Sequence, residues 1–140
     1  MKLLQIPPEV TDQVWGAVMP YLAQAVEYSR GTNSLESAKT RAKSGQAQLW
    51  AIIEDEKPHK VMAAGLTSLT DYPTGKRAML VELLGGNGMN LWFDLRHELE
   101  DWAKKNGCSV CFWWARKGWL RKMPDDYRVT HFVMSKTLAS

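Results

Sequence analysis

At 140 residues the chain is long enough to bury a core unaided, so we expect one domain over residues 1–140. Its 18 Lys and Arg against 15 Asp and Glu leave a formal net charge of +3, which demands no polyanionic partner. No apolar run reaches the length of a membrane-spanning helix, and the patch before Pro7 is too short for a signal peptide. A cytoplasmic location is expected.

The first third of the sequence predicts a short strand and two helices. The strand covers 2–6, and apolar residues at helical spacing over 10–25 predict the first helix. Asn33 with Glu36 three residues later resembles a capping box, which predicts a second helix ending near residues 44–45. Because this second helix is basic and carries little apolar surface, we expect it to be a solvated lid.

Three strands are predicted in the middle of the chain. Residues 49–53 and 61–69 form the first two, joined by a charged turn over 54–60. Gly65 inside the second of them predicts a bulge or a close backbone approach. The third strand, over 77–84, leads into the glycine loop Gly85-Gly86-Asn87-Gly88.

The clearest element is a long amphipathic helix from Asn90, its expected N-cap, to Asn106. Its apolar stripe, which we expect to face the sheet, consists of Leu91, Trp92, Leu95, Leu99, Trp102 and Ala103. Gly107 supplies the left-handed residue that ends a helix. Because the glycine loop leads into the helix N-terminus, free backbone N–H groups converge there, which favours a bound phosphate.

The C-terminal third predicts two more strands. Residues 110–114 follow a helix, so this strand should lie parallel to the strand at 77–84. A short basic segment over 115–123 comes next, and alternating residues over 129–138 predict a closing strand. The fold class expected is α+β, with a mixed, mostly antiparallel sheet of about six or seven strands flanked by helices.

The two cysteines form a C-x-x-C pair, Cys108 and Cys111. On a strand, residues three apart point to opposite faces, and one pair supplies only half of a tetrahedral zinc site. We therefore expect structural cysteines and no metal.

Three segments belong together as a set: the helix end 100–108, the segment 115–122, which is similar to a G-R-x-G-W motif, and the closing segment from Tyr127 to Leu138. As a set they resemble the GNAT family of N-acetyltransferases, and in particular its small phage and prophage members. The resemblance covers roughly residues 49–138. It implies an acyl-CoA N-acyltransferase fold and transfer of an acetyl group from acetyl-CoA to a primary amine.

The resemblance also implies site residues. In the family a loop with a G-x-G motif binds the pyrophosphate of acetyl-CoA, and the leading Gln or Arg of that motif falls on Leu83 here. The implied cofactor-binding residues are Leu83, Leu84, Gly85, Gly86, Asn87, Gly88, Met89 and Asn90. Glu82 is the implied general base, and Tyr127 is the second choice for an acid because the segment before it has no tyrosine.

Several alternatives stay open. The loop could be a strand-to-helix turn without a ligand, and Glu82 could be an outward-facing strand residue. Leu83 and the missing tyrosine favour a catalytically inactive GNAT-like phage protein, serving as a virion or regulatory component. A nucleic-acid-binding module is a further alternative, because 112–122 interleaves aromatics with cations, although the low net charge disfavours it. The acceptor amine and the oligomeric state, a homodimer included, stay open.

Overall fold

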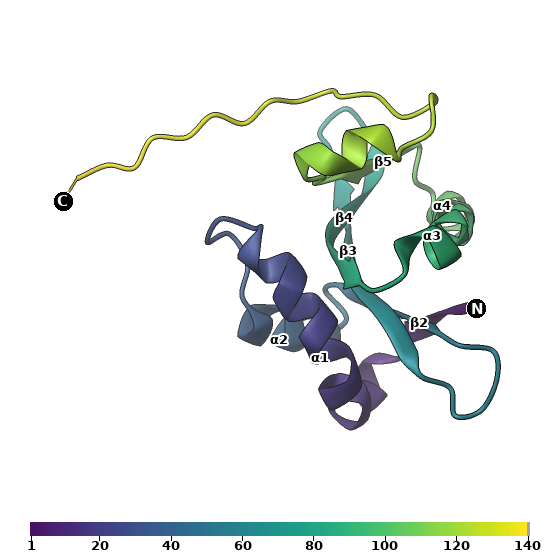
Figure 1. Cartoon of the computed structure of the whole chain (residues 1–140). Coiled ribbons are helices and arrows are strands. Elements are labelled where there is room, and N and C mark those ends of the chain that lie inside the picture. The colour runs from purple at the N-terminus through teal and green to yellow at the C-terminus, as the bar shows by residue number, and fades with distance from the viewer. Residues whose placement is uncertain (140) are drawn as a thin grey trace.

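A five-stranded sheet lies at the centre of the protein, with helices on both faces (Figure 1). The computed structural model describes residues 1–139. The strands are β1 (Lys2–Ile6), β2 (Gln48–Ile53), β3 (Val61–Asp71), β4 (Arg77–Gly86) and β5 (Val110–Trp113). The α-helices are α1 (Thr11–Glu27), α2 (Leu35–Ser44), α3 (Met89–Trp92) and α4 (Arg96–Lys105). Short 3₁₀ helices cover Pro8–Val10, Phe93–Leu95 and Lys117–Arg121.

The strands follow one another across the sheet in the order β1-β2-β3-β4-β5. The first four are antiparallel to their neighbours, and β4 and β5 are parallel. The parallel pair confirms the sequence prediction, because the helical connection between β4 and β5 returns the chain to the starting end of the sheet. The expected mixed sheet is therefore present, but it has five strands over the described residues instead of six or seven.

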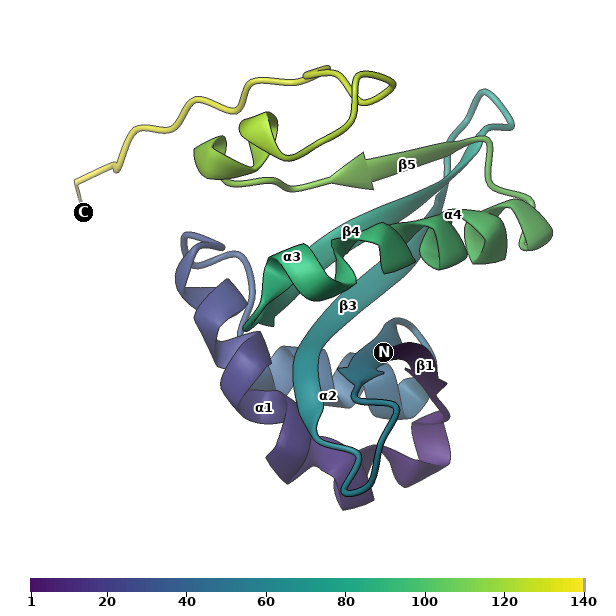
Figure 2. The same ribbon diagram turned by 45° about the vertical axis from the view of Figure 1, so that its right-hand side comes forward.

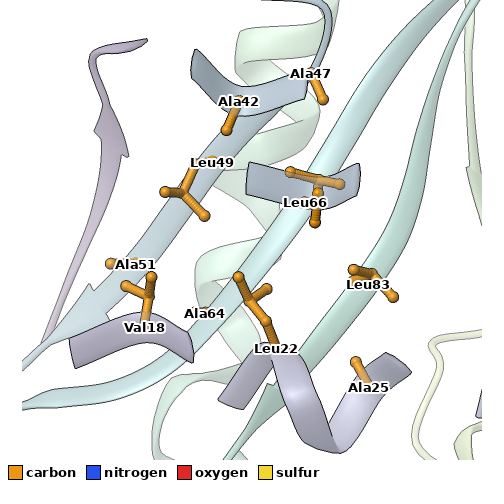
Figure 3. Packing of buried hydrophobic residues seen from close by; sticks show 11 residues of the cluster. Val18, Leu22, Ala25, Ala42, Ala47, Leu49, Ala51, Ala64, Leu66 and Leu83 are labelled. Carbon is orange, nitrogen blue, oxygen red and sulfur yellow. The ribbon is translucent and has the colours of Figure 1, made fainter. Parts of the chain in front are cut away.

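Helices α1 and α2 cover one face of the sheet and enclose the larger hydrophobic cluster (Figure 3). Its buried members are Val18, Leu22, Ala25, Ala38, Ala42, Ala47, Leu49, Ala51, Ala64, Leu66 and Leu83. Helix α2 belongs to this core through two small residues, Ala38 and Ala42, which are at most 2% exposed. The expectation of a merely solvated lid is therefore wrong for one side of α2, because alanines let the helix pack closely on the sheet while Lys39 and Lys43 pair with Asp12 at the surface.

Helix α4 covers the opposite face of the sheet and packs on β4 and β2 (Figure 2). Leu99 and Ala103 are buried there, as predicted, together with Trp50 and Met79. The ring of Trp102 is half-buried and meets Trp50 edge to face, with 5.3 Å between ring centroids.

The predicted single helix from Asn90 to Asn106 is wrong, because the 3₁₀ turn Phe93–Leu95 separates α3 from α4. The tighter turn rotates the apolar stripe, so that Leu91 is 70% exposed while Phe93 packs inward. The N-cap is Gly88, in the left-handed conformation, and not Asn90.

The ends of the other helices follow the sequence more closely. Ser34, not Asn33, caps α2, and its hydroxyl accepts the N–H of Ser37 at 3.0 Å. Gly45 and Gly107 adopt positive φ angles, as expected for residues that end a helix.

The predicted closing strand over 129–138 is wrong for this structure. Residues 128–139 form no regular element and extend away from the body of the protein (Figure 1). An isolated extended segment has no ladder partner, and a single strand is not stable without one. The alternating sequence therefore predicted a strand, but the structure offers this segment no neighbouring strand to pair with.

Candidate functional site

The parallel strands β4 and β5 separate before β4 ends. Their pairing stops at Val81 and Trp113, and the N–H of Trp114 makes the next bond, to the Val81 carbonyl at 3.2 Å. Strand β4 continues to Gly86, paired with β3 alone. Figure 2 shows β5 diverging from β4 toward the end of β4 that leads into α3.

A β-bulge lies where the two strands separate. Leu66 pairs with Leu83 while Thr67 pairs with Val81, so Glu82 has no partner on β3. A bulge bends its strand and increases the local twist. The bulge at Glu82 therefore accounts for the turn of β4 away from β5.

Beyond the bulge, β4 offers backbone groups on its open side. The N–H of Asn87 donates to the Met62 carbonyl at 2.9 Å, which marks a hydrogen-bonded position of the β3–β4 ladder. Because such positions alternate in antiparallel pairs, the backbone groups of Gly86 and Leu84 point away from β3. They face the side that β5 has left.

An open groove of about 450 Å³ lies next to this stretch of β4. It is lined by Tyr28, Leu84, Gly85, Gly86, Met89, Trp92, Arg116, Gly118, Trp119 and Lys122. The groove therefore joins the end of β4, the start of α3 and the segment after β5.

Close packing explains two of the glycines without any ligand. A Cβ atom on Gly85 would lie 2.1 Å from the Tyr21 carbonyl oxygen, and one on Gly86 would lie 2.6 Å from that of Met62. Both residues belong to β4, so the predicted four-residue loop is shorter than expected. Glycine here is required by the approach of α1 and β3 to β4.

The predicted phosphate-binding loop is thus reduced to its second half. The Asn87 N–H is already bonded to Met62, and the Asn87 carbonyl accepts the Trp92 indole N–H at 2.7 Å. The N–H groups of Met89 and Asn90 lie in the first turn of α3, where no intrahelical acceptor exists. Leu83 is 2% exposed in the α1 core, whereas Leu84 lines the groove.

Two cations border the groove, and no Asp or Glu is among the described residues that line it. The Arg116 guanidinium lies 4.1 Å from the ring centre of Tyr28 and 5.8 Å from that of Trp119. The Lys122 ammonium lies 3.8 Å from the sulfur of Met89, at the start of α3. The groove is therefore suited to an anionic ligand. Sequence reasoning did not single out Tyr28, since its contacts are made only by the fold.

Glu82 is held in an ion pair. Its carboxylate accepts hydrogen bonds from Arg41 of α2 at 2.7 and 2.9 Å and from Asn33 at 3.3 Å. The side chain is 7% exposed. Burial raises the pKa of Glu82, but hydrogen bonds from Arg41, Ser68 and Asn33 outweigh it and hold this pKa below its usual value. Glu82 is therefore ionised at neutral pH.

Tyr127 has a different environment from Glu82. Its hydroxyl donates to Glu100 of α4, and its ring packs against Trp113. Burial and the neighbouring Glu100 carboxylate raise the pKa of Tyr127 above its ordinary value, so the phenol stays protonated at neutral pH. Glu82 bonds to α2 and Tyr127 to α4, the helices on opposite faces of the sheet, and Tyr127 is not among the groove-lining residues.

The cysteines carry no sign of activation. Both are free thiols, and burial raises the pKa of Cys111 to about 11, so its reactive thiolate is scarce at neutral pH.

Over residues 1–139 no three His, Cys, Asp or Glu side chains gather as a metal site would require. In the same part of the chain, no helix combines the length and apolarity that crossing a membrane requires.

Solved structures resemble this chain over nearly its whole length. A ribosomal-protein-alanine N-acetyltransferase from Brucella melitensis biovar Abortus 2308 has a TM-score of 0.66 and 15% identity, covering 99% of this chain and 97% of its own. An aminoglycoside acetyltransferase from an uncultured soil metagenomic sample, solved with sisomicin, has a TM-score of 0.69 and 11% identity, covering 99% and 96%. The glucosamine-6-phosphate N-acetyltransferase of Arabidopsis thaliana has a TM-score of 0.64 and 15% identity, covering 99% and 98%.

These likenesses show the fold alone, because the identities are low. The chain has the GNAT-like acyl-CoA N-acyltransferase fold. No protein-family model and no curated protein matches the sequence.

Proposed function

We propose that the protein is an acetyl-CoA-dependent N-acetyltransferase that transfers an acetyl group to a primary amine. The observation that carries the proposal is the separation of β4 from β5 beside an open groove that reaches the start of α3. The separation leaves backbone groups of β4 without a strand partner. The expectation of a phage or prophage origin rests on the resemblance of the sequence alone.

In this proposal acetyl-CoA occupies the groove. The pantetheine arm pairs with the outward-facing backbone groups of Leu84 and Gly86, along the stretch of β4 where β5 no longer pairs with it. The pyrophosphate lies against the N–H groups of Gly88, Met89 and Asn90, near Lys122. Because Asn87 is already bonded to Met62 and position 83 is a buried leucine, fewer donors remain than the family motif supplies. We therefore expect weak binding.

The proposed reaction is direct transfer. The amine nitrogen attacks the thioester carbonyl, the C–N bond forms, the C–S bond breaks, and the CoA thiolate takes up a proton. Glu82 is the proposed base for the proton that leaves the amine. Its ion pair with Arg41 keeps it ionised, and this carboxylate would also attract a cationic amine to the bulge.

The proposed acid is Tyr127, which must release Glu100 before it can protonate a thiolate in the groove. Its raised pKa keeps the proton available at neutral pH. Tyr28 is the tyrosine that already lines the groove, and it offers a second hydroxyl for the same step.

A specific observation favours the catalytically inactive alternative. Glu82 is paired with Arg41, and Tyr127 is bonded to Glu100, so both implied catalytic groups have structural partners. In that case the protein would be a GNAT-like virion or regulatory component without catalytic activity, whether or not its groove binds CoA.

The nucleic-acid alternative has less support. The Trp113 ring packs against the rings of Phe93 and Trp119, with 6.2 and 5.8 Å between ring centroids. These faces are therefore not free to stack on bases. Trp114 is 59% exposed, and a single exposed ring offers a poor stacking platform.

Two measurements on one sample test the proposal. Titration calorimetry with acetyl-CoA reports binding, and release of the CoA thiol in the presence of a panel of primary amines reports transfer. Binding together with amine-dependent thiol release supports the enzyme. Binding without release for every amine supports the inactive alternative, and no binding at millimolar acetyl-CoA contradicts the proposal.

A further inference from the structure

A second, smaller cavity lies between the sheet and the helices α3 and α4, and we call it the inner cavity. Its volume is about 20 Å³. Strands β2, β4 and β5 and both helices contribute to its wall. The large apolar or aromatic side chains among its lining include Trp50, Val81, Leu84, Trp92, Leu99 and Trp113.

The lining of the inner cavity suits hydrocarbon. Besides the tryptophans, its polar side chains are those of Thr67 and Arg96, and both already hydrogen-bond within the chain. The Thr67 hydroxyl accepts the Trp50 indole N–H at 2.9 Å and donates to Gln48. The Arg96 guanidinium donates to the Phe93 carbonyl at 3.3 Å. An apolar group is therefore a better occupant than a polar one.

The inner cavity reaches the place where β4 and β5 part. Val81 and Trp113, which line it, are the last residues of the two strands to pair. In the proposed function the pantetheine arm runs along β4 from Gly86 to Leu84, away from α3, so its thioester end arrives near this point. Leu84 lines both the groove and the inner cavity, so the two spaces are neighbours.

We propose that the inner cavity receives the end of the acyl chain, and that the protein prefers propionyl-CoA to acetyl-CoA. The inference rests on the acyl-CoA site of the proposed function. A cavity of this volume holds about one water-sized group, and propionyl exceeds acetyl by one methylene. Leu84 is half-buried, and a change of its rotamer would open the passage from the groove.

The chemistry of transfer keeps the same balance with the longer acyl group. The C–N bond to the amine forms, the C–S bond breaks, and a proton passes from the amine to the CoA thiolate. Burial of one additional methylene should tighten binding about fourfold. A six-carbon hexanoyl chain requires more space than the inner cavity provides, so it should lose this gain.

Titration calorimetry with acetyl-, propionyl-, butyryl- and hexanoyl-CoA tests the proposal, because binding does not depend on an unidentified amine. The dissociation constant of propionyl-CoA should be about fourfold lower than that of acetyl-CoA. Hexanoyl-CoA should bind more weakly than propionyl-CoA.

Substitutions at Val81 change the size of the inner cavity. Val81→Ile adds a carbon to the lining and should remove the preference for propionyl-CoA. Val81→Ala removes two methyl groups and should make butyryl-CoA bind more tightly than propionyl-CoA. Val110→Ile is the matched control, because Val110 is half-buried on β5 but does not line the inner cavity, and it should keep the natural order. Circular dichroism should show a folded spectrum for each variant.

The outcomes separate this inference from the proposed function. If none of the thioesters binds at millimolar concentration, the acyl-CoA site and the inference both fail. If acetyl-CoA binds the natural protein as tightly as propionyl-CoA or more tightly, the inference alone is overturned. The same conclusion follows if a folded Val81→Ile variant keeps the natural preference, or if a folded Val81→Ala variant gains nothing for butyryl-CoA.

Discussion

The environment of Glu82 has opposite effects on two properties of its carboxylate, its strength as a proton acceptor and its attraction for a cation. The bulge leaves it without a partner on β3, at the point of β4 where the pairing with β5 ends. Its side chain does not line the groove and bonds to Arg41 and Asn33. The ion pair with Arg41 then fixes it and keeps it ionised. A carboxylate with a lowered pKa is a weak proton acceptor but a strong partner for an ammonium group. If Glu82 takes part in transfer, both effects should be measurable.

Glu82→Gln should lower the rate of acetyl transfer about a hundredfold and leave acetyl-CoA binding unchanged, because glutamine cannot accept the amine proton. Steady-state thiol release measures the rate, and calorimetry measures the binding. Glu98→Gln, an exposed position on α4, is the matched control and should keep the natural rate. Unchanged turnover in the Glu82 variant would remove that residue from the mechanism.

Arg41→Ala should lower the free energy of unfolding at neutral pH by about 2–3 kcal/mol, because it leaves a buried carboxylate without its cation. The loss stays below that of a fully buried pair since Asn33 still donates to Glu82. Denaturant unfolding measures the difference. Lys43→Ala is the control on the same helix, because its ion pair with Asp12 is exposed and should contribute less than about 1 kcal/mol.

The effect of Arg41→Ala should depend on pH. Because the folded-state pKa of Glu82 lies below its ordinary 4.5, the pair stabilises the fold above that pH. The contribution is lost as pH falls through the lowered folded-state pKa. The natural protein and the variant should therefore converge in stability under acidic conditions. A difference that stayed constant down to that range would show that the carboxylate is not what Arg41 stabilises.

At the scale of elements, the break between α3 and α4 decides which residues reach the groove. The 3₁₀ turn Phe93–Leu95 directs Phe93 toward Trp113 and Trp119 and leaves Leu91 in solvent. Helix α4 then packs on β2 and β4 through Leu99, Trp102 and Ala103. The two helices consequently have different tasks, α3 at the groove and α4 over the core.

Trp102→Ala should lower the free energy of unfolding by about 3 kcal/mol, the lower end for a large aromatic residue, because the ring is only half-buried. The edge-to-face contact with Trp50 is lost as well. Leu91→Ala, 70% exposed, is the control and should change stability by less than about 0.5 kcal/mol. Equal effects of the two substitutions in denaturant melts would contradict the packing described for α4.

Much of the fold could be predicted because most of its helices and strands have a recognisable pattern in the local sequence. Periodicity located β2 to β5, and the helical connection predicted that β4 and β5 are parallel. The sequence pattern over 129–138 also predicted a strand, yet pairing depends on a neighbour that local pattern does not specify. The stripe beginning at Leu91 misled because a single 3₁₀ turn shifts the buried face without changing composition.

The candidate site was less predictable, because its contacts join distant parts of the chain. Glu82 was located as the only carboxylate on its strand, but Arg41, its partner, showed only as one cation of a basic helix. Tyr28 and Arg116 meet across the groove with no local signal in either segment. The glycines of β4 were assigned to phosphate binding, whereas close packing already accounts for Gly85 and Gly86.

On the scale of the whole molecule, the groove lies where the two halves of the sheet part. The end of β4, the start of α3 and Tyr28 line it from one half, and the segment after β5 lines it from the other. Such a division lets a ligand bridge both halves through backbone groups, and binding should therefore stabilise the entire fold. This stabilisation is the most direct consequence of the proposed acetyl-CoA site.

Gly88 provides a variant that separates ligand binding from backbone strain. A Cβ atom there would lie 3.4 Å from its nearest neighbour, a Leu91 methyl carbon, so substitution causes no clash, only strain at a φ of +67°. Gly88→Ala should lower stability by about 1 kcal/mol and still bind acetyl-CoA. Gly88→Glu adds a carboxylate beside the proposed pyrophosphate position and should abolish binding.

Thermal unfolding with and without acetyl-CoA, for the natural sequence and both Gly88 variants, tests the central claim most directly. At a hundred times its dissociation constant the ligand should add about 2.7 kcal/mol of stability. The midpoint of the natural protein and of Gly88→Ala should then rise by roughly 5–10 °C, while that of Gly88→Glu stays unchanged. If millimolar acetyl-CoA leaves the midpoint of the natural protein where it was, the groove is not an acetyl-CoA site and the enzyme proposal fails.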